Sequence, residues 1–449
     1  MALDKAALLT SVNRFGMGEV ESVADVSECG ESHPLLASDL VDGESTIVES
    51  VVVLANTCIG AGVLAVPYAL SVTGVALGLA LLVAVALLSM FSFYLLAETR
   101  RLSGQRSYED IAAFYFGQAG RRVVQASLVL LLIGATIIYA ILMSDSLHPV
   151  VSQYAPASPW LSRDWLSVYA VALIYPLTLA QDLRFLRHTS MAALGCLIYL
   201  LIALCVRLFQ SVSTLRVESG TDPSPDPHII RLRYAIVSSK FFLALPIIAV
   251  AFNGQFNAVR VANELRNPTK SRVLAVSTGA VSVCLVFYIL FGLVGIYSFG
   301  VATKGDVLLN FRSDDVLVNV GRVALFLVLA FSYPLFFLPL RETIALILAP
   351  IVDIRSRGLP ARIALTTALN AIALITSMLV PNLPGMLDVV GATCGMGIAF
   401  ILPGMFGYKA NYSRPGKQIA CVALAVIGVV CGIISTVVTI ATWDEIGSS

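Results

Sequence analysis

The sequence has little charge for its length. Only 13% of its 449 residues are Asp, Glu, Lys or Arg, about half of the roughly 25% found in soluble domains, and 58% are hydrophobic. This composition excludes an ordinary water-exposed surface and predicts an all-α polytopic membrane protein. The net charge of +1 gives no reason to expect a nucleic-acid partner.

Motifs for metal, nucleotide or enzyme chemistry are also missing. The chain has no C-x-x-C pair, no H-E-x-x-H helix and no phosphate-binding G-x-x-x-x-G-K-[ST] loop. No nucleophile–base pair or pair of carboxylates lies deep in an apolar segment, so we expect neither an intramembrane enzyme nor a cofactor. Seven of the eight cysteines fall in apolar segments, where they are expected to be small core residues without structural disulfides.

The N-terminal segment differs from the rest of the chain. Residues 1–46 lack the basic start and apolar core of a signal peptide and are rich in acidic residues, which predicts a disordered cytosolic tail. Within it, Glu31, Leu35 and Leu36 form an acidic-dileucine pattern that resembles a sorting signal for lysosomal or vacuolar delivery. A vacuolar or lysosomal membrane and the plasma membrane both stay open as locations.

The remainder of the chain contains eleven apolar segments long enough to cross a membrane. They lie near residues 47–70, 75–97, 123–147, 165–181, 189–209, 235–253, 273–299, 316–340, 361–380, 384–408 and 418–442. Most Lys and Arg residues fall in the connections on the N-terminal side, so the N-terminus is predicted to be cytosolic. A short tail, 443–449, follows. Charged residues near segment ends, such as Arg207 and Arg322, are expected to snorkel to the membrane interface or to cap helix ends.

Two segments carry helix breakers at membrane depth. The first contains Gly60-Ala61-Gly62 and then Pro67, and the sixth contains Asn253-Gly254-Gln255. Each is the first of a set of five, 47–209 and 235–408. Because five is odd, the second set would cross the membrane upside down. Paired interrupted helices in two inverted halves indicate the midplane site of a secondary transporter. Helix packing by small residues is the alternative for the glycines.

Broken helices suit a zwitterionic ligand. Half-helix N-termini present positive dipole ends to a carboxylate, and freed carbonyl oxygens can accept hydrogen bonds from an ammonium group. The ligand and cavity water then satisfy the exposed backbone.

Four motifs resemble those of the amino acid/auxin permease family, most closely its sodium-coupled neutral amino acid transporters and vacuolar relatives. They begin at Asn56, Phe252, Ser332 and Val390 and read NTCIGAGVLAVP, FN with a following ELRNP, SYP with PLR, and VGAT through PG. The resemblance covers about 47–442. It implies two inverted five-helix repeats of the LeuT type plus an eleventh helix at 418–442.

The resemblance also implies roles for individual residues. Asn56 and Ser332 match positions tied to sodium in the sodium-coupled members, and both offer the oxygen ligands that a hard cation prefers. The residues implied to bind substrate are Thr57, Cys58, Ile59, Gly60, Ala61, Gly62, Phe252 and Asn253, and Tyr139 is an additional cavity candidate. Many relatives have Cys-His after Phe-Asn, where this chain has Gly254-Gln255.

The expected function is secondary active transport of small, neutral amino acids by a monomer in contact with membrane lipid. Sodium coupling is favoured over proton coupling because no carboxylate or histidine lies at a clear midplane position. Asp145, His148 and Asp388 are the proton-relay candidates. The alternatives are a proton-coupled or uncoupled vacuolar or lysosomal carrier of cationic or aromatic amino acids, and an amino-acid sensor that signals through the tail.

Overall fold

The computed structural model of the chain describes residues 43–154, 158–179, 186–218, 241–351, 358–379, 389–411 and 414–441. Within these ranges the regular secondary structure is helical, apart from one isolated bridge between Ser45 and Leu265. The dileucine pattern at 31–36 and the candidate Asp388 lie outside the described residues.

The first apolar segment is broken at its glycines, as the sequence predicted. Helix α2 (Ile47–Cys58) starts with a capping box in which the side chains of Thr46 and Glu49 each accept a hydrogen bond from the other's backbone N–H. It ends at Cys58. After Gly60, a 3₁₀ turn, η3 (Ala61–Ala65), leads into α3 (Val66–Thr73). Pro67 lies in the first turn of α3, where its missing N–H costs nothing. The segment bends by 55° between its two halves.

The sixth segment is broken as well. Helix α8 (Phe241–Ala251) and helix α9 (Gln255–Glu264) are separated by Phe252, Asn253 and Gly254. The expected segment ended at 253, whereas the structure continues it through α9 to Glu264. Because α9 contains several polar residues, the predicted apolar segment did not include it.

The other membrane helices are largely continuous. Helix α5 starts fifteen residues before the expected 123 and kinks at Gly117, which has a positive φ of 65° that glycine adopts without strain. The bounds of the other long helices are α4 (Val75–Ser103), α5 (Tyr108–Tyr154), α6 (Arg163–Thr178), α7 (Leu186–Glu218), α10 (Lys270–Phe299), α11 (Val316–Leu348), α12 (Gly358–Leu379), α14 (Leu402–Ala410) and α15 (Pro415–Ala441). Two π-helical stretches, η8 (Gly391–Gly395) and η9 (Gly397–Ile401), precede α14.

The number of membrane crossings follows from these lengths. In the described part of the chain, nine helices are long and apolar enough to cross a membrane, and the bent pair in the first segment raises the count to ten. Helix α6, the fourth expected segment, has 16 residues. That is slightly shorter than the ~17–25 residues of a typical spanning helix.

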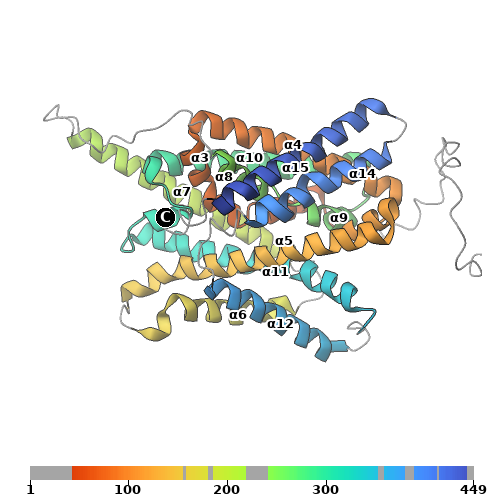
Figure 1. The fold of residues 1–449 in the computed structure, drawn as a ribbon. Coiled ribbons are helices and arrows are strands. Elements are labelled where there is room, and N and C mark those ends of the chain that lie inside the picture. Colours follow the sequence, from red (N-terminus) through yellow and green to blue (C-terminus); the bar gives the residue numbers. More distant parts are fainter. Residues whose placement is uncertain are drawn as a thin grey trace, which may run out of the picture. The chain divides into compact units, whose positions relative to one another are not determined.

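Two groups of helices surround the breaks. Helix α10 packs along α2, α3 and α4, and α3 packs on α8. Helix α11 lies along α5 and α7 (Figure 1). Helices α6 and α12 pack together beside α5, and α14 lies against α15 (Figure 1). The two broken segments are therefore enclosed by continuous helices on several sides.

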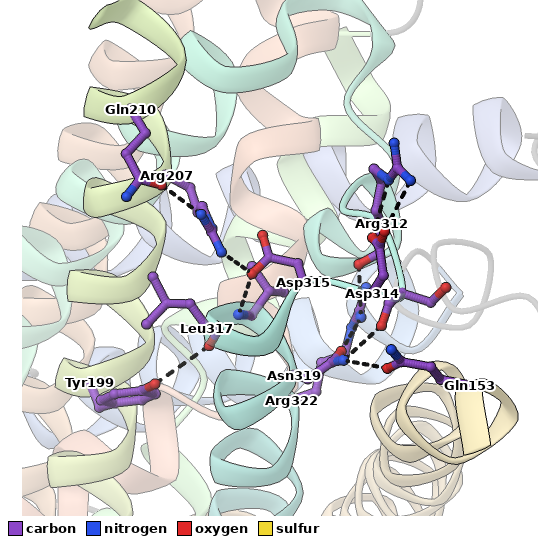
Figure 2. Close-up of polar contacts among 12 residues, drawn as sticks. Gln153, Tyr199, Arg207, Gln210, Arg312, Asp314, Asp315, Leu317, Asn319 and Arg322 are labelled. Carbon is purple, nitrogen blue, oxygen red and sulfur yellow. Dashed lines mark hydrogen bonds and ion pairs between the residues drawn. The ribbon is translucent and has the colours of Figure 1, made fainter. Parts of the chain in front are cut away.

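A loop between α10 and α11 covers one end of the broken segments. Its 3₁₀ turn η7 (Val307–Asn310) contacts η3. Arg322 of α11 is only 1% exposed, which excludes snorkelling for this side chain. Its guanidinium instead donates to the carbonyls of Leu308 at 2.9 Å and Phe311 at 3.0 Å, which fixes the loop. Figure 2 shows Arg322 beside Asn319, to which it also donates, and the Arg207–Asp315 ion pair between α7 and the start of α11.

The opposite end is tied by backbone hydrogen bonds. The Ser45 N–H donates to Glu264 O at 2.9 Å, and the Arg266 N–H donates to Ser45 O at 2.9 Å. Arg100 of α4 donates to the Asn263 side chain at 2.8 Å. The entry to α2 is thus joined to the end of α9.

Candidate functional site

A small cavity lies between the two breaks. Its volume is about 30 Å³, well below the ~300 Å³ of a typical small ligand site, so an amino acid can enter only if the surrounding side chains move apart. The cavity is lined by Thr57, Cys58, Gly60, Gly62, Leu131, Ala135, Ile138, Tyr139, Val250, Asn253, Phe256, Phe336 and Val390.

The lining has a polar side and an apolar side. Thr57, Tyr139 and Asn253 bring hydroxyl and amide groups, and none of the residues that line the cavity carries a charge. Phe256 and Phe336 pack ring against ring with centroids 5.4 Å apart and form part of the apolar wall. A charged ligand side chain would find no counter-ion in this lining, whereas an apolar one would be buried favourably.

The glycines of the first break allow close approach. A Cβ at Gly60 would lie 2.1 Å from the hydroxyl oxygen of Tyr139 on α5. A Cβ at Gly62 would lie 3.0 Å from the Cα of Ala251, at the end of α8. At both positions a side chain would force a neighbour to move, and at Gly60 that neighbour is a residue of the cavity lining.

A second polar cluster lies beside the first break. The Oδ1 atom of Asn56 accepts a hydrogen bond from the Ser332 hydroxyl of α11 at 3.2 Å. Its Nδ2 atom donates to the Ser190 hydroxyl of α7 at 3.1 Å. All three side chains are at most 1% exposed. Three helices thus place neutral oxygen atoms together in a buried position, which suits a monovalent hard cation.

Several amide atoms in the sixth-segment break have no partner among the described residues. These are Oδ1 of Asn253, Oδ1 of Asn257 and both ends of Gln255, which is fully buried. Asn257 uses its Nδ2 atom to reach the Leu335 carbonyl at 3.3 Å. Unsatisfied buried polar groups are rare in folded proteins, and their concentration here favours a site that is completed by a ligand or water.

The structure brings together most of the residues predicted to bind substrate. Thr57, Cys58, Gly60, Gly62, Asn253 and Tyr139 all line the cavity. Ile59 is fully buried, and Ala61 begins η3. Phe252 is not among the lining residues. Its ring packs against Tyr288 with centroids 5.0 Å apart, and Phe256 lies on the cavity instead. Asn56 and Ser332 meet as the resemblance implied.

Sequence reasoning missed the apolar wall. Leu131, Ile138, Val250, Phe336 and Val390 line the cavity, but apolar residues in apolar helices carry no local signal that separates cavity from core. The proton-relay candidate Asp145 lies away from this lining and is paired with Arg163, with Oδ2 3.0 Å from Nη2.

Comparison with known proteins agrees with this geometry. Residues 43–443 match the family model described as transmembrane amino acid transporter protein. The chain belongs to this family. A curated relative, the sodium-coupled neutral amino acid symporter 2 of Danio rerio, is 26% identical over 395 residues, which cover 84% of this chain and 78% of the relative. The expectation of a transporter rather than an enzyme is confirmed by the family.

A solved structure shares the fold. The crystal structure of MhsT in complex with L-phenylalanine superposes with a TM-score of 0.61 over 89% of this chain and 99% of that chain, at 11% identity. At this identity the likeness concerns the fold alone. The transporter is thus an all-helical, multi-pass membrane protein that shares the fold of MhsT.

Proposed function

We propose that this transporter carries small neutral amino acids across a membrane by alternating access, coupled to sodium. The observation that carries the proposal is the cavity between the two breaks, which has backbone ends on one side, an apolar wall on the other and no charged residue in its lining. The neutral amino acid symporter among its relatives supports the same substrate class.

Each part of the substrate has a matching part of the site. The backbone of residues 57–62 binds the carboxylate and ammonium groups, because the break leaves amides and carbonyls without helical partners. Asn253 adds an amide from the sixth segment, and the apolar wall takes the side chain. Because the cavity holds only about 30 Å³, alternating access requires the helices around it to move apart on each side in turn.

Sodium binds at Asn56 and Ser332. Their side chains meet at 3.2 Å in a buried position, and Asn56 directly precedes the substrate-binding segment. An ion between α2 and α11 would hold the first break in its binding conformation, so ion and substrate would stabilise each other. The ion is a co-transported substrate, and no other cofactor enters the proposal.

The membrane arrangement completes the proposal. Adding α6 to the candidate spans gives eleven crossings, arranged as two inverted five-helix repeats (47–209 and 235–408) and one extra helix. The N-terminus is cytosolic, with residues 1–46 as a tail, and the protein is a monomer in a vacuolar, lysosomal or plasma membrane.

Counterflow in liposomes tests this function. Purified protein is offered a mixture of labelled amino acids, with and without sodium and at two pH values. Sodium-dependent exchange of neutral amino acids is expected. Exchange that follows pH would replace sodium with a proton, and exchange of cationic amino acids would overturn the substrate class. Binding of an amino acid without flux would contradict transport and support the sensor alternative.

A further inference from the structure

A second, larger hollow lies between helix α15 and the π-helical stretches η8 and η9. Its volume is about 330 Å³, within the ~300–1,000 Å³ of small-molecule sites. It shares no lining residue with the cavity between the breaks. We call it the α15 groove, and it is lined by Ala392, Thr393, Ile401, Gly428, Val429, Gly432, Ile433, Thr436 and Val437.

The α15 groove opens toward the lipid. Val429, Ile433 and Val437 on its rim are 41%, 61% and 60% exposed, and they belong to a helix long and apolar enough to cross a membrane. Exposed apolar side chains on such a helix face the hydrocarbon of the bilayer. An empty groove there would lose van der Waals contacts along its whole wall. A component of the membrane is therefore the expected occupant.

Two glycines form the floor of the groove. Gly428 and Gly432 have the G-x-x-x-G spacing that often joins membrane helices of two molecules. Here the spacing is used within one chain. A Cβ at Gly428 would lie 2.9 Å from Cγ1 of Ile401, and a Cβ at Gly432 would lie 2.8 Å from Ala392 O. These contacts leave a flat surface without side chains and take the motif away from a second copy of the chain.

The polar groups of the groove are two hydroxyls. The Thr393 hydroxyl donates to Val389 O at 2.6 Å, and the Thr436 hydroxyl donates to Gly432 O at 2.8 Å. Each proton is used within its own helix, while each oxygen can still accept a hydrogen bond. None of the described residues that line the groove carries a charge. The groove therefore suits a ligand with a hydroxyl donor and offers no cation for the phosphate of a phospholipid.

The depth of these groups matches one leaflet of a bilayer. Thr436 lies ~7.5 Å before the end of α15 at Ala441, and Thr393 lies close to the start of η8 at Gly391. Both hydroxyls are thus near the same end of their helices. Gly428 lies ~12 Å deeper along α15, a length comparable to the ~15 Å half-thickness of the hydrocarbon core. The groove runs from near one interface toward the midplane.

These features together describe a sterol. A sterol has one hydroxyl at the interface end, and its flat, rigid ring system extends toward the midplane. The glycine floor accepts the flat face, and the Val and Ile side chains of the rim cover the edge. A rigid ligand also loses less conformational freedom on binding than a flexible acyl chain does.

A ligand in this groove would lie behind one wall of the substrate cavity. Val390, which directly precedes η8, lines that cavity. Within η8, Gly395 O accepts a hydrogen bond from Nδ2 of Asn253 at 3.3 Å. A Cβ at Gly391 would lie 2.6 Å from Pro246 O of α8. One side of η8 therefore packs on the sixth-segment break, and its other side borders the groove.

We propose that the α15 groove binds a membrane sterol. The sterol hydroxyl donates to Thr393 or Thr436, and the rings fill the space over Gly428 and Gly432, so that η8 is supported from the lipid side. This site goes beyond the proposed function, because it concerns a lipid ligand and does not depend on which amino acid or ion is carried.

The first test is photolabelling. Purified protein in phosphatidylcholine liposomes is irradiated with a diazirine-bearing cholesterol analogue, and the labelled residues are located by peptide mass spectrometry. We expect label on 392–401 and 428–437, and an excess of cholesterol should prevent it. Cholesterol should also raise the midpoint of thermal unfolding, because a ligand that binds the folded state stabilises it.

Two tryptophan variants of α15 form a matched pair. In Ile433→Trp the indole takes up space within the groove, so labelling should fall about tenfold and the stabilisation by cholesterol should disappear. Ile427→Trp is the control, because Ile427 is 39% exposed on the same helix and does not line the groove. It should keep both effects. Thermal unfolding without cholesterol shows whether each variant is folded.

The second test uses the unmodified protein and examines the hydroxyl. Cholest-4-en-3-one has a ketone in place of the hydroxyl and cannot donate to a threonine oxygen. It should compete with the photolabel about fivefold more weakly than cholesterol, as expected for the loss of one neutral hydrogen bond. Thr393→Val combined with Thr436→Val should remove this difference.

Several results would overturn the proposal. Label outside the groove, equal labelling of Ile433→Trp and Ile427→Trp, or no stabilisation by cholesterol would exclude a sterol site here. Equal protection by diacylglycerol would assign the groove to acyl chains. A dimer of the purified protein that Ile433→Trp converts to a monomer would assign it to a second copy of the chain.

Discussion

The contact between Gly60 and Tyr139 gives the sharpest prediction about the site. A methyl group at Gly60 would lie 2.1 Å from the Tyr139 hydroxyl oxygen and 3.1 Å from Cζ. Ordinary contacts begin near 3.4 Å, so Tyr139 would have to move by more than 1 Å. Its ring is packed against Phe336 with centroids 4.9 Å apart, which opposes that movement.

The magnitude follows from the cost of overpacking. Forcing one methyl group into a filled site costs roughly 1–3 kcal/mol, which is about fivefold to 150-fold in an equilibrium constant. In Gly60→Ala we therefore expect a loss of substrate affinity in this range. Removing the hydroxyl with Tyr139→Phe leaves Cζ as the nearest atom, and a displacement of a few tenths of an ångström then suffices. The double variant should regain about tenfold of the loss.

The assay is a double-mutant cycle on amino acid uptake in liposomes, with thermal stability measured in parallel. Gly195→Ala is the control, because a Cβ at Gly195 on α7 meets no atom within 4 Å. It should transport like the wild type. The reasoning is refuted if Gly60→Ala transports normally, or if it is equally impaired with Tyr and with Phe at position 139.

Three further outcomes are expected. Ser332→Ala should raise the half-saturating sodium concentration about tenfold, since it removes one of the proposed ligands; an unchanged sodium dependence in uptake would exclude that site. Burial raises the pKa of Asp306, in the loop before α11, from 3.8 to about 7. The folded protein therefore favours the neutral carboxyl group of Asp306. The free energy of unfolding should fall by about 1.4 kcal/mol per pH unit between roughly pH 4 and 7. Thermal melts should show this pH dependence, and Asp306→Asn should remove it. Arg322→Met should lower the free energy of unfolding by roughly 3 kcal/mol, because the carbonyls of Leu308 and Phe311 lose their buried donor; a melting temperature equal to that of the wild type would contradict the role of Arg322 in fixing the loop.

The positions of the breaks could be predicted from the sequence because glycine, proline and amide residues are unusual at membrane depth. GAG near residue 60 and NGQ near residue 254 predicted the ends of α2 and α8 correctly. The meeting of Asn56 with Ser332, 276 positions apart, came from the resemblance. Local pattern carries no information about such a distant pair.

The remaining parts of the site depend on helix rotation and packing, which one sequence does not encode locally. Phe252 and Phe256 are both aromatic, yet only Phe256 lines the cavity, because the break changes which face each residue presents. Arg322 resembled a residue at a helix end, but the loop folds over it and buries it.

The central claim is that the two breaks form the binding site of a sodium-coupled carrier. Its most direct test is uptake of a labelled neutral amino acid by wild-type protein in liposomes under an imposed sodium gradient. For coupling of one ion to one substrate, an inward gradient of about tenfold, or ~1.4 kcal/mol, should drive accumulation toward a comparable ratio. Gly60→Ala should slow the initial uptake at substrate concentrations below half-saturation. Accumulation that ignores the sodium gradient would contradict the coupling, and the absence of any uptake would contradict the account as a whole.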